Sequence, residues 1–311
     1  MRSFRITKPG KFEIADRPVP KPARGEVLVR MEYASMCNQN DYKFFHGHYT
    51  GFAYPMDWGA FGHEGVGVVA RLGAGVRGLK AGDRVVVSGL GGPMIYSELV
   101  PRKADCLVRI SPRVPARSAA VLELFACAHH ALGIAGDVKG KRVAVSGTGP
   151  AGLALIQLLR LRRPKEIVAI DIAASRLAAA RKAGATRTVN AASAAAMKRL
   201  AADAPEVFID ASGYVESMKA SLKLARKLVV IFGFSQQPFE VVQSEWFGRE
   251  LVIKNTAIHT LADLTAVCRL LEAKKINPAP FVSRVMRFEQ YKEAVELIGK
   301  KKVIKILLVW D

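Results

Sequence analysis

The stretch "VAVSGTGPAG", residues 143–152, decides the fold of this chain. It begins as a short strand of small and β-branched residues, and a helical pattern starts at Pro150. Gly147, Gly149 and Gly152 therefore form a G-x-G-x-x-G between a strand and a helix. These glycines would make the tight turn, let the backbone approach a pyrophosphate and let helix and strand pack closely, in that order. The motif predicts a dinucleotide-binding βαβ unit.

Residues around this loop indicate which dinucleotide it binds. Thr148, Pro150 and Ala151 complete the loop at the helix N-terminus, whose N–H groups and partial positive charge suit phosphates. The next strand, "EIVAID", ends in Asp171, nineteen residues after the last glycine of the motif. A carboxylate there can accept a hydrogen bond from the ribose 2′-hydroxyl and would repel a 2′-phosphate, which favours NAD over NADP. Arg176, one turn into the next helix, could either meet a 2′-phosphate or lie in solvent.

Outward from the loop, the sequence divides into two styles. From Lys141 onward strands and helices alternate, which indicates a parallel sheet covered on both faces. The first hundred residues instead contain short runs rich in β-branched residues and glycine, typical of a small bulged β-barrel. After Pro278 the pattern returns to strand, helix, strand. We predict an α/β protein with a β-rich domain over residues 1–117, completed by 276–311, and a doubly wound domain over 118–275.

Bulk composition argues against several classes of protein. The four cysteines are widely spaced and form no C-x-x-C pair, which fits a reducing compartment and a cytoplasmic location. The first twenty residues have no apolar signal core, and we expect no run of about 18 apolar residues that would span a membrane. The net charge of +20 is spread along the chain without a basic cluster interleaved with aromatics, so we expect no nucleic-acid partner.

Three residues far apart in the sequence form a candidate metal site. Cys37 lies in "MCNQNDYKFFHG", His63 in "FGHEGVG" and Glu123 in "VLELFACAHHAL". A lone histidine is more often an ordinary core or surface residue. Together, however, a thiolate, an imidazole and a carboxylate leave the fourth tetrahedral position open to water or substrate, which is typical of catalytic zinc.

The order of these segments resembles the zinc-dependent medium-chain alcohol dehydrogenase superfamily, and within it the sorbitol/threonine dehydrogenase-like group. The resemblance runs over almost the whole chain. It implies a GroES-like β-barrel catalytic domain and a Rossmann domain, with zinc, nicotinamide and an alcohol in the cleft between them. It also implies that Cys37 and His63 bind the catalytic zinc, that Glu123 lies in or near its coordination sphere, and that Glu64 acts beside the metal or exchanges onto it. Relatives form dimers or tetramers, so a homodimer or homotetramer is implied.

Two departures from that family are visible. Many relatives carry four closely spaced cysteines for a structural zinc, whereas Cys106 is alone in the corresponding region here. We therefore predict one catalytic zinc and no structural zinc. Relatives also carry Ser or Thr two positions after the zinc-binding cysteine, as a proton relay, where this chain has Gln39. Gln has no labile hydroxyl, although its amide can orient water or a substrate hydroxyl. Asp41, His46 or His48 could carry the proton instead.

The function that follows is reversible oxidation of a secondary alcohol, of the polyol, cyclitol or amino-alcohol type, to a ketone with hydride transfer to NAD. The alternative is a zinc-free medium-chain reductase of the quinone or enoyl type that uses NAD(P)H. Retention of Cys37, His63 and Glu123 argues against this alternative, while Gln39 argues weakly for an altered chemistry. From another class, the chain could be a catalytically inactive binding or regulatory protein.

Overall fold

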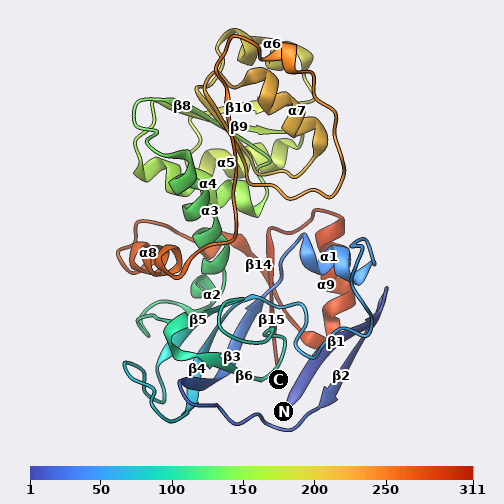
Figure 1. Cartoon of the computed structure of the whole chain (residues 1–311), viewed down its shortest axis with the longest axis vertical. Coiled ribbons are helices and arrows are strands. Elements are labelled where there is room, and N and C mark those ends of the chain that lie inside the picture. Colours follow the sequence, from blue (N-terminus) through green and yellow to red (C-terminus); the bar gives the residue numbers. More distant parts are fainter. Residues whose placement is uncertain (311) are drawn as a thin grey trace. The chain divides into compact units, whose positions relative to one another are not determined.

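A computed structural model describes residues 1–310 of the chain. The chain forms two compact units, Met1–Glu123 with Leu264–Asp311, and Leu124–Asp263 (Figure 1). From the sequence we predicted that the second domain begins after residue 117 and ends before residue 276. In the structure the second unit begins after Glu123 and ends before Leu264, so the two boundaries differ by six and twelve residues.

The first unit is built mainly on antiparallel sheet. Within the described residues, a seven-stranded sheet has the order β14-β15-β3-β4-β5-β7, with β6 also paired to β3, and β1 pairs with β2 separately. The strands are β1 (Arg2–Lys8), β2 (Lys11–Asp16), β3 (Glu26–Ser35), β4 (Glu64–Leu72), β5 (Arg84–Ser88), β6 (Leu99–Lys103), β7 (Val108–Arg109), β14 (Val282–Arg287) and β15 (Lys305–Val309). The β-rich domain predicted for this part of the sequence is confirmed.

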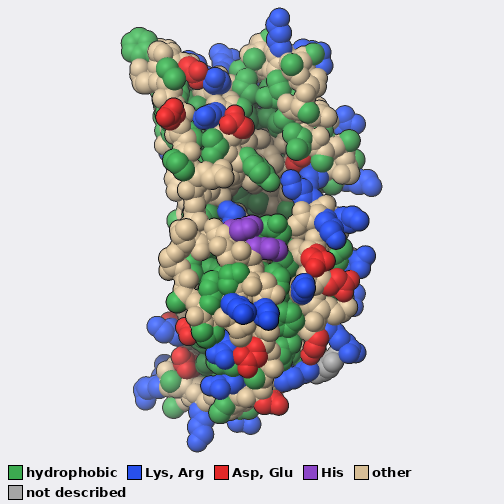
Figure 2. Space-filling model, turned by 90° about the vertical axis from the view of Figure 1, so that its right-hand side faces the viewer, with side chains coloured by type: hydrophobic (Ala, Val, Ile, Leu, Met, Phe, Trp, Pro, Cys, Tyr) green, Lys and Arg blue, Asp and Glu red, His purple; other side chains and the backbone are tan. Residues whose placement is uncertain are grey.

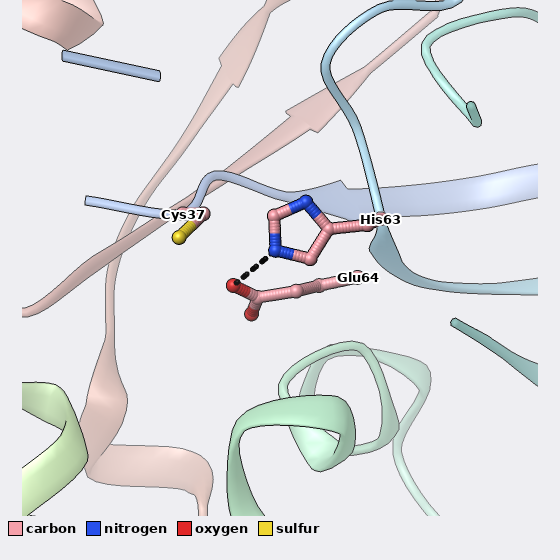
Figure 3. Close-up of side chains that lie close together, drawn as sticks. All are labelled: Cys37, His63 and Glu64. Carbon is pink, nitrogen blue, oxygen red and sulfur yellow. Dashed lines mark ion pairs between the residues drawn. The ribbon is translucent and has the colours of Figure 1, made fainter. Parts of the chain in front are cut away.

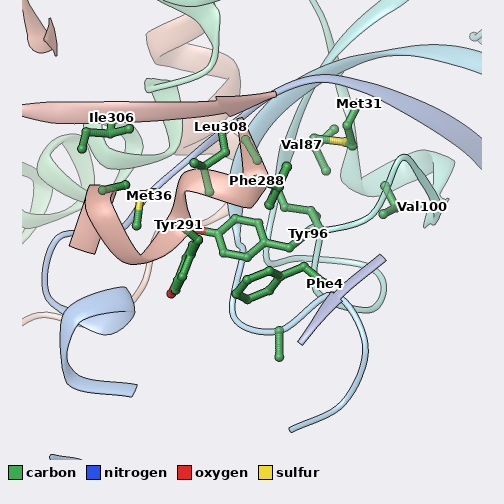
Figure 4. Packing of buried hydrophobic residues seen from close by; sticks show 14 of the residues in the cluster. Phe4, Met31, Met36, Val87, Tyr96, Val100, Phe288, Tyr291, Ile306 and Leu308 are labelled. Carbon is green, nitrogen blue, oxygen red and sulfur yellow. The ribbon is translucent and has the colours of Figure 1, made fainter. Parts of the chain in front are cut away.

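Short helices and an aromatic core complete this unit. The helices are α1 (Asn40–Phe45), α2 (Ala116–Ala119) and α9 (Tyr291–Gly299), with single 3₁₀ turns at Ala104–Cys106, Ala279–Phe281 and Phe288–Gln290. Phe4, Tyr96, Phe288 and Tyr291 are fully buried and pack edge to face or tilted against one another (Figure 4). Because these rings come from both ends of the chain, the core fixes α9 and the C-terminal strand against the first strands.

The second unit is a doubly wound parallel sheet. Its strand order within the described part of the chain is β10-β9-β8-β11-β12-β13, and every neighbouring pair is parallel. The strands are β8 (Arg142–Ser146), β9 (Glu166–Asp171), β10 (Arg187–Asn190), β11 (Val207–Asp210), β12 (Leu228–Ile231) and β13 (Val252–Asn255). The order reverses between β8 and β11, so ligands are expected beyond the carboxyl ends of those strands.

Helices cover this parallel sheet as right-handed crossovers require. They are α4 (Pro150–Leu161), α5 (Ala174–Ala183), α6 (Ala194–Ala202) and α7 (Val215–Leu224), with a 3₁₀ turn at Gln243–Glu245. Leu155, Ile156 and Leu159 of α4 are completely buried. The Rossmann-type domain predicted from the G-x-G-x-x-G context is confirmed.

Two helices carry the chain across the limits of the units, α3 (Leu122–Ala135) and α8 (Leu261–Glu272). The segment Ala116–Ala135 is long and apolar enough to cross a membrane by length and composition alone, but 67% of it is buried inside the protein. The segment also contains Arg117 and Glu123, so a single helix of this kind is weak evidence for a membrane span. The burial is what a core helix requires.

On the face that Figure 2 shows, Lys and Arg side chains occur singly and in small groups, with acidic side chains among them. With a net charge of +20, such side chains give the protein a general positive field.

Candidate active site

Pairing of β3 with β4 brings the two best metal-ligand candidates together. Ser35, the last residue of β3, pairs with Glu64, the first residue of β4. Cys37, just after β3, and His63, just before β4, therefore lie side by side (Figure 3). Ligand atoms of Cys37, His63 and Glu64 all lie within 4.8 Å of one another, and His63 Nε2 is 3.9 Å from Glu64 Oε1. A thiol, an imidazole and a carboxylate at this spacing fit an open tetrahedral zinc site.

The surroundings of His63 are strongly negative. Burial works to lower the pKa of His63, but a hydrogen bond to Cys37 and the charges of Cys37, Glu123 and Glu64 outweigh it and raise that pKa well above its usual value. Nδ1 of the ring lies 3.1 Å from the carbonyl oxygen of Phe61, which orients the imidazole. A pocket that favours positive charge on an imidazole would also favour a bound cation.

Glu64 is held in place by a buried lysine. Lys305 Nζ donates to Glu64 Oε1 at 2.8 Å and to the Met36 carbonyl at 2.6 Å, and Ser35 Oγ donates to Glu64 Oε2 at 3.1 Å. Both ionic side chains are 2% exposed. Burial works to lower the pKa of Lys305, but Glu64 raises it, so the ammonium stays charged. Lys305 therefore ties the residue before Cys37 to the residue after His63.

A second buried carboxylate lies behind Cys37. Asp41 is fully buried, and its oxygens accept hydrogen bonds from Tyr96 Oη, Tyr291 Oη and the backbone N–H of Cys37 at 2.7–2.8 Å. Burial raises the pKa of Asp41, while these donors work to lower it. We named Asp41 from the sequence as a candidate to carry a proton toward solvent. Its full burial makes it a buttress for the Cys37 backbone.

The other residues named for the catalytic site lie around this group. Glu123, at the start of α3, is 6% exposed and is not among the three ligand atoms within 4.8 Å, although its charge acts on His63. Gln39 occupies the N-cap position of α1, and its side chain makes no capping hydrogen bond there. His46 and His48 are exposed, and their rings are stacked 5.5 Å apart. The structure therefore groups Glu64, in place of Glu123, with Cys37 and His63.

In the second unit, the glycine loop has the geometry that its sequence requires. Gly147 has φ +84°, which favours glycine, and a side chain at Gly152 would collide with the Gly147 carbonyl. Pro150 opens α4 with Gly149 as its N-cap. The cradle is therefore closed to side chains and open to a pyrophosphate, which is the fit expected of a dinucleotide.

Asp171 and Arg176 lie beside this loop. Asp171 Oδ2 accepts hydrogen bonds from the Thr148 N–H at 2.8 Å and from its hydroxyl at 3.0 Å, and Oδ1 accepts from the Ala173 N–H at 3.0 Å. A carboxylate has about four acceptor positions, so Oδ1 can still accept from a ribose hydroxyl. A Cβ at Gly149 would lie 3.9 Å from Arg176 Nη1, which places the guanidinium near the phosphate cradle.

Sequence reasoning missed two polar clusters of this unit. His129 Nδ1 and His130 Nδ1 lie 2.7 and 3.0 Å from the two oxygens of Asp263, which also accepts from Thr260. Burial works to raise the pKa of Asp263, but the Thr260 and histidine hydrogen bonds hold it below its usual range. Adjacent histidines on an apolar helix face were a signal for a buried acidic partner.

The other missed cluster pairs a thiol with an imidazole. Cys127 Sγ is 3.6 Å from Nδ1 of His259, a buried side chain. From the sequence alone, a lone cysteine on an apolar helix face is interpreted as a small buried hydrophobic residue. Nothing in the local sequence connects it with a histidine 132 residues away.

Two family models match the chain. "Alcohol dehydrogenase GroES-like domain" matches residues 23–109, and "Zinc-binding dehydrogenase" matches residues 150–273. The first match covers the strands that carry Cys37 and His63. The second covers α4 and most of the parallel sheet.

Relatives cover the whole chain. The starvation-sensing protein RspB of Escherichia coli strain K12 is 27% identical, over 100% of this chain and of that protein. The sorbitol dehydrogenase of Gallus gallus is 27% identical, over 98% of this chain and 95% of that enzyme. A crystal structure of the short chain alcohol dehydrogenase RspB from E. coli CFT073 complexed with NADH superimposes with a TM-score of 0.90 at 26% identity, over 100% and 99% of the two chains.

Proposed function

The chain belongs to the zinc-dependent medium-chain alcohol dehydrogenase superfamily, and from that membership we propose that it oxidises a secondary alcohol of the polyol, cyclitol or amino-alcohol type to a ketone, with NAD as hydride acceptor. The observation that carries this proposal is the grouping of Cys37, His63 and Glu64 in a chain that also has a dinucleotide loop. The sorbitol dehydrogenases among its relatives support the polyol class.

For the metal, we propose that Cys37 and His63 hold one zinc ion and that either Glu64 or Glu123 supplies the third ligand. When bound, zinc would supply Lewis acidity toward the substrate hydroxyl. The 4.8 Å grouping favours Glu64, which Lys305 keeps oriented from the opposite side. The influence of Glu123 on His63 supports a place for it beside the open position. We propose no structural zinc, because Cys106 has no neighbouring cysteines in sequence.

For the cofactor, NAD is proposed over NADP. The nicotinamide ring would accept the hydride, and the protein would orient it. Asp171 supports NAD because a carboxylate beside the ribose repels a 2′-phosphate, whereas Arg176 would attract one. The ratio of kcat/KM for NAD to that for NADP measures the choice. We expect Asp171→Ala to lower this ratio by at least about tenfold. That corresponds to a loss of about 1.4 kcal/mol in discrimination between NAD and NADP.

The main experiment compares metal content, cofactor affinity and turnover in single variants. We expect Cys37→Ser and His63→Ala to lose zinc, measured by atomic absorption, and turnover of polyols, while NADH still binds with unchanged fluorescence enhancement. Cys268→Ser, at a buried helical cysteine away from this group, is the matched control and keeps about one zinc per chain. Purified wild-type protein with full reductase activity and no zinc would support the quinone or enoyl type instead.

Glu64→Gln and Glu123→Gln separate the two candidates for the third ligand. Each keeps the size of the side chain and removes its charge. We expect Glu64→Gln to weaken zinc affinity more. If Glu123→Gln alone loses the metal, the assignment that we first made from the sequence is restored. If both variants bind zinc as tightly as the wild type, neither carboxylate is a zinc ligand.

A homodimer or homotetramer is also proposed. Strand β13 lies at one edge of the parallel sheet, and Val252 and Ile253 on it are 48% and 45% exposed. An uncapped apolar edge strand is a template for pairing with another chain. Ile253→Lys should convert the oligomer to a monomer in sedimentation, whereas Lys254→Glu on the same strand is the control for charge alone. We further expect the protein in the cytoplasm, in keeping with four free cysteines.

A further inference from the structure

Arg102 is a positively charged side chain enclosed in the first unit. It lies on β6, opposite Val27 of β3, and none of its surface is exposed. Burial lowers the pKa of Arg102 to about 10, while Cys106 and Glu26 work to raise it, so the guanidinium is protonated at neutral pH. Burying a charge is costly unless partners replace the lost water.

One edge of this guanidinium has no protein partner. Nη1 donates to the Pro101 carbonyl at 3.3 Å, but among residues 1–310 no acceptor pairs with Nε or Nη2. The nearby Glu26 carboxylate accepts instead from the Ala23 N–H at 3.0 Å. Because Nε and Nη2 share one edge of the planar group, a single ligand with two oxygens can satisfy both.

Two glycines lie in the turn beside Arg102, and one of them lies against the guanidinium. A side chain at Gly92 would collide with Arg102 Nη1, and one at Gly91 would collide with Cys106. Gly91 is half-buried with φ +75°, and Gly92 is exposed. An exposed glycine therefore lies directly against a buried positive charge. Displacement of this turn would give a small ion a route to the guanidinium.

We propose that Arg102 and the turn of residues 89–92 form a binding site for a small oxyanion, of the phosphate or carboxylate class, which presents two oxygens to Nε and Nη2. The two free donors on one edge fix the geometry of the ligand, and the enclosure fixes its small size. The net charge of +20 raises the local concentration of such anions. The site uses none of the residues assigned to the metal or to the dinucleotide.

The same turn contacts the metal-site histidine. A Cβ at Gly89 would lie 3.3 Å from the Cβ of His63, and Ser88, just before it, pairs with Glu64 across β4 and β5. An anion that fixes one end of the turn also fixes its packing against His63 at the other. This regulatory consequence rests on the proposed function, whereas anion binding itself does not.

Sodium phosphate is the probe, added to the whole chain at constant ionic strength. Calorimetry gives its Kd, and thermal unfolding gives the stabilisation. We expect phosphate at 100 times its Kd to raise the unfolding temperature of the wild type by about 5–10 °C. Arg102→Met should lose this rise and bind at least about tenfold more weakly. Without phosphate it should be no less stable than the wild type, because the unpaired charge is gone. Arg113→Met, at an exposed arginine of the same unit, keeps the effect.

Three outcomes would overturn the site. An equal rise in the wild type and in Arg102→Met means a general salt effect, and no phosphate binding by the wild type means that water satisfies the guanidinium. Arg102→Lys covers the case in which the methionine variant fails to fold, because it keeps the charge and removes the two-donor edge. Undiminished affinity in Arg102→Lys also counts against the proposal. Zinc content and alcohol turnover, measured separately, show whether the proposed function fails independently.

Discussion

Removing Lys305 should destabilise the first unit strongly, because its partner Glu64 is buried with it. The ammonium contacts both carboxylate oxygens at 2.7–2.8 Å and the Met36 carbonyl at 2.6 Å, and both ionic side chains are 2% exposed. Breaking one side of such a pair costs about 3–5 kcal/mol, since the remaining charge is buried alone. In a cooperative unit of this size, that corresponds to a fall in unfolding temperature of about 6–20 °C for Lys305→Met.

A double-mutant cycle isolates the pair. Glu64→Gln alone leaves a buried ammonium and should cost a similar amount, whereas Lys305→Met with Glu64→Gln removes both charges. We expect the double variant to be more stable than the sum of the single effects predicts, by at least about 3 kcal/mol. Lys300→Met is the control, because its pairing with Glu296 is exposed and 4.0 Å long, and it should change stability by less than about 0.5 kcal/mol.

The assay is urea unfolding of metal-stripped protein in a Trp246→Phe background. The remaining tryptophans, Trp58 and Trp310, both belong to the first unit, so the fluorescence reports on that unit. A Lys305→Met protein within about 1 kcal/mol of its parent, or a double variant as unstable as the two single effects added, would refute the reasoning. The buried pair would then contribute no more than an exposed one.

Two further predictions concern the second unit. Gly152→Ala should lower the free energy of unfolding by about 1–3 kcal/mol and weaken NADH binding, because the new methyl group collides with the Gly147 carbonyl. Gly133→Ala is the control: this glycine lies inside α3, and a Cβ there would meet nothing within 4 Å. It should raise the free energy of unfolding by about 0.5–1 kcal/mol. Thermal unfolding and NADH titration check both, and equal effects of the two substitutions would contradict the packing argument. Asp263→Asn should cost about 2 kcal/mol at pH 7, because the folded pKa lies below the unfolded one and the hydrogen bonds from Thr260 favour the charged form. This stabilisation by the charged carboxylate is present above the unfolded pKa, near 4, and is lost as the pH falls through the folded pKa. The difference in free energy of unfolding between wild type and variant, measured by urea unfolding across pH, should therefore narrow below pH 4. A difference that does not change with pH would contradict the prediction.

The fold was predictable because its deciding signals are local. The glycine loop, the strand before it and Asp171 lie within one βαβ unit, where spacing alone fixes which residues meet. Cys37 and His63 could be singled out from the sequence, since thiol and imidazole are rare and chemically distinctive, and the structure places them side by side. Which carboxylate lies nearest to them was not predictable. Glu64 reaches it through the β3–β4 register, and its lysine partner comes from a strand 241 residues away.

Burial could not be read from the sequence for the charged side chains that matter most. Asp41 looks like an accessible acid in a polar segment, yet the hydroxyls of Tyr96 and of Tyr291, at the start of α9, enclose it. Lys305 and Arg102 lie in ordinary strand patterns, yet they are the lysine and arginine that the described residues bury completely.

The contrast between these two cations shows what burial implies about function. Lys305 has a carboxylate and a carbonyl as partners, so its cost is offset inside the protein and its role is to position Glu64. Arg102 has one long hydrogen bond to its own neighbour, so its cost is not offset by the described residues. A buried charge with partners is explained by the fold, whereas one without them calls for a ligand. The turn of residues 89–92 lies against His63, which is grouped with Cys37 and Glu64. A ligand at Arg102 would therefore alter the packing of that group.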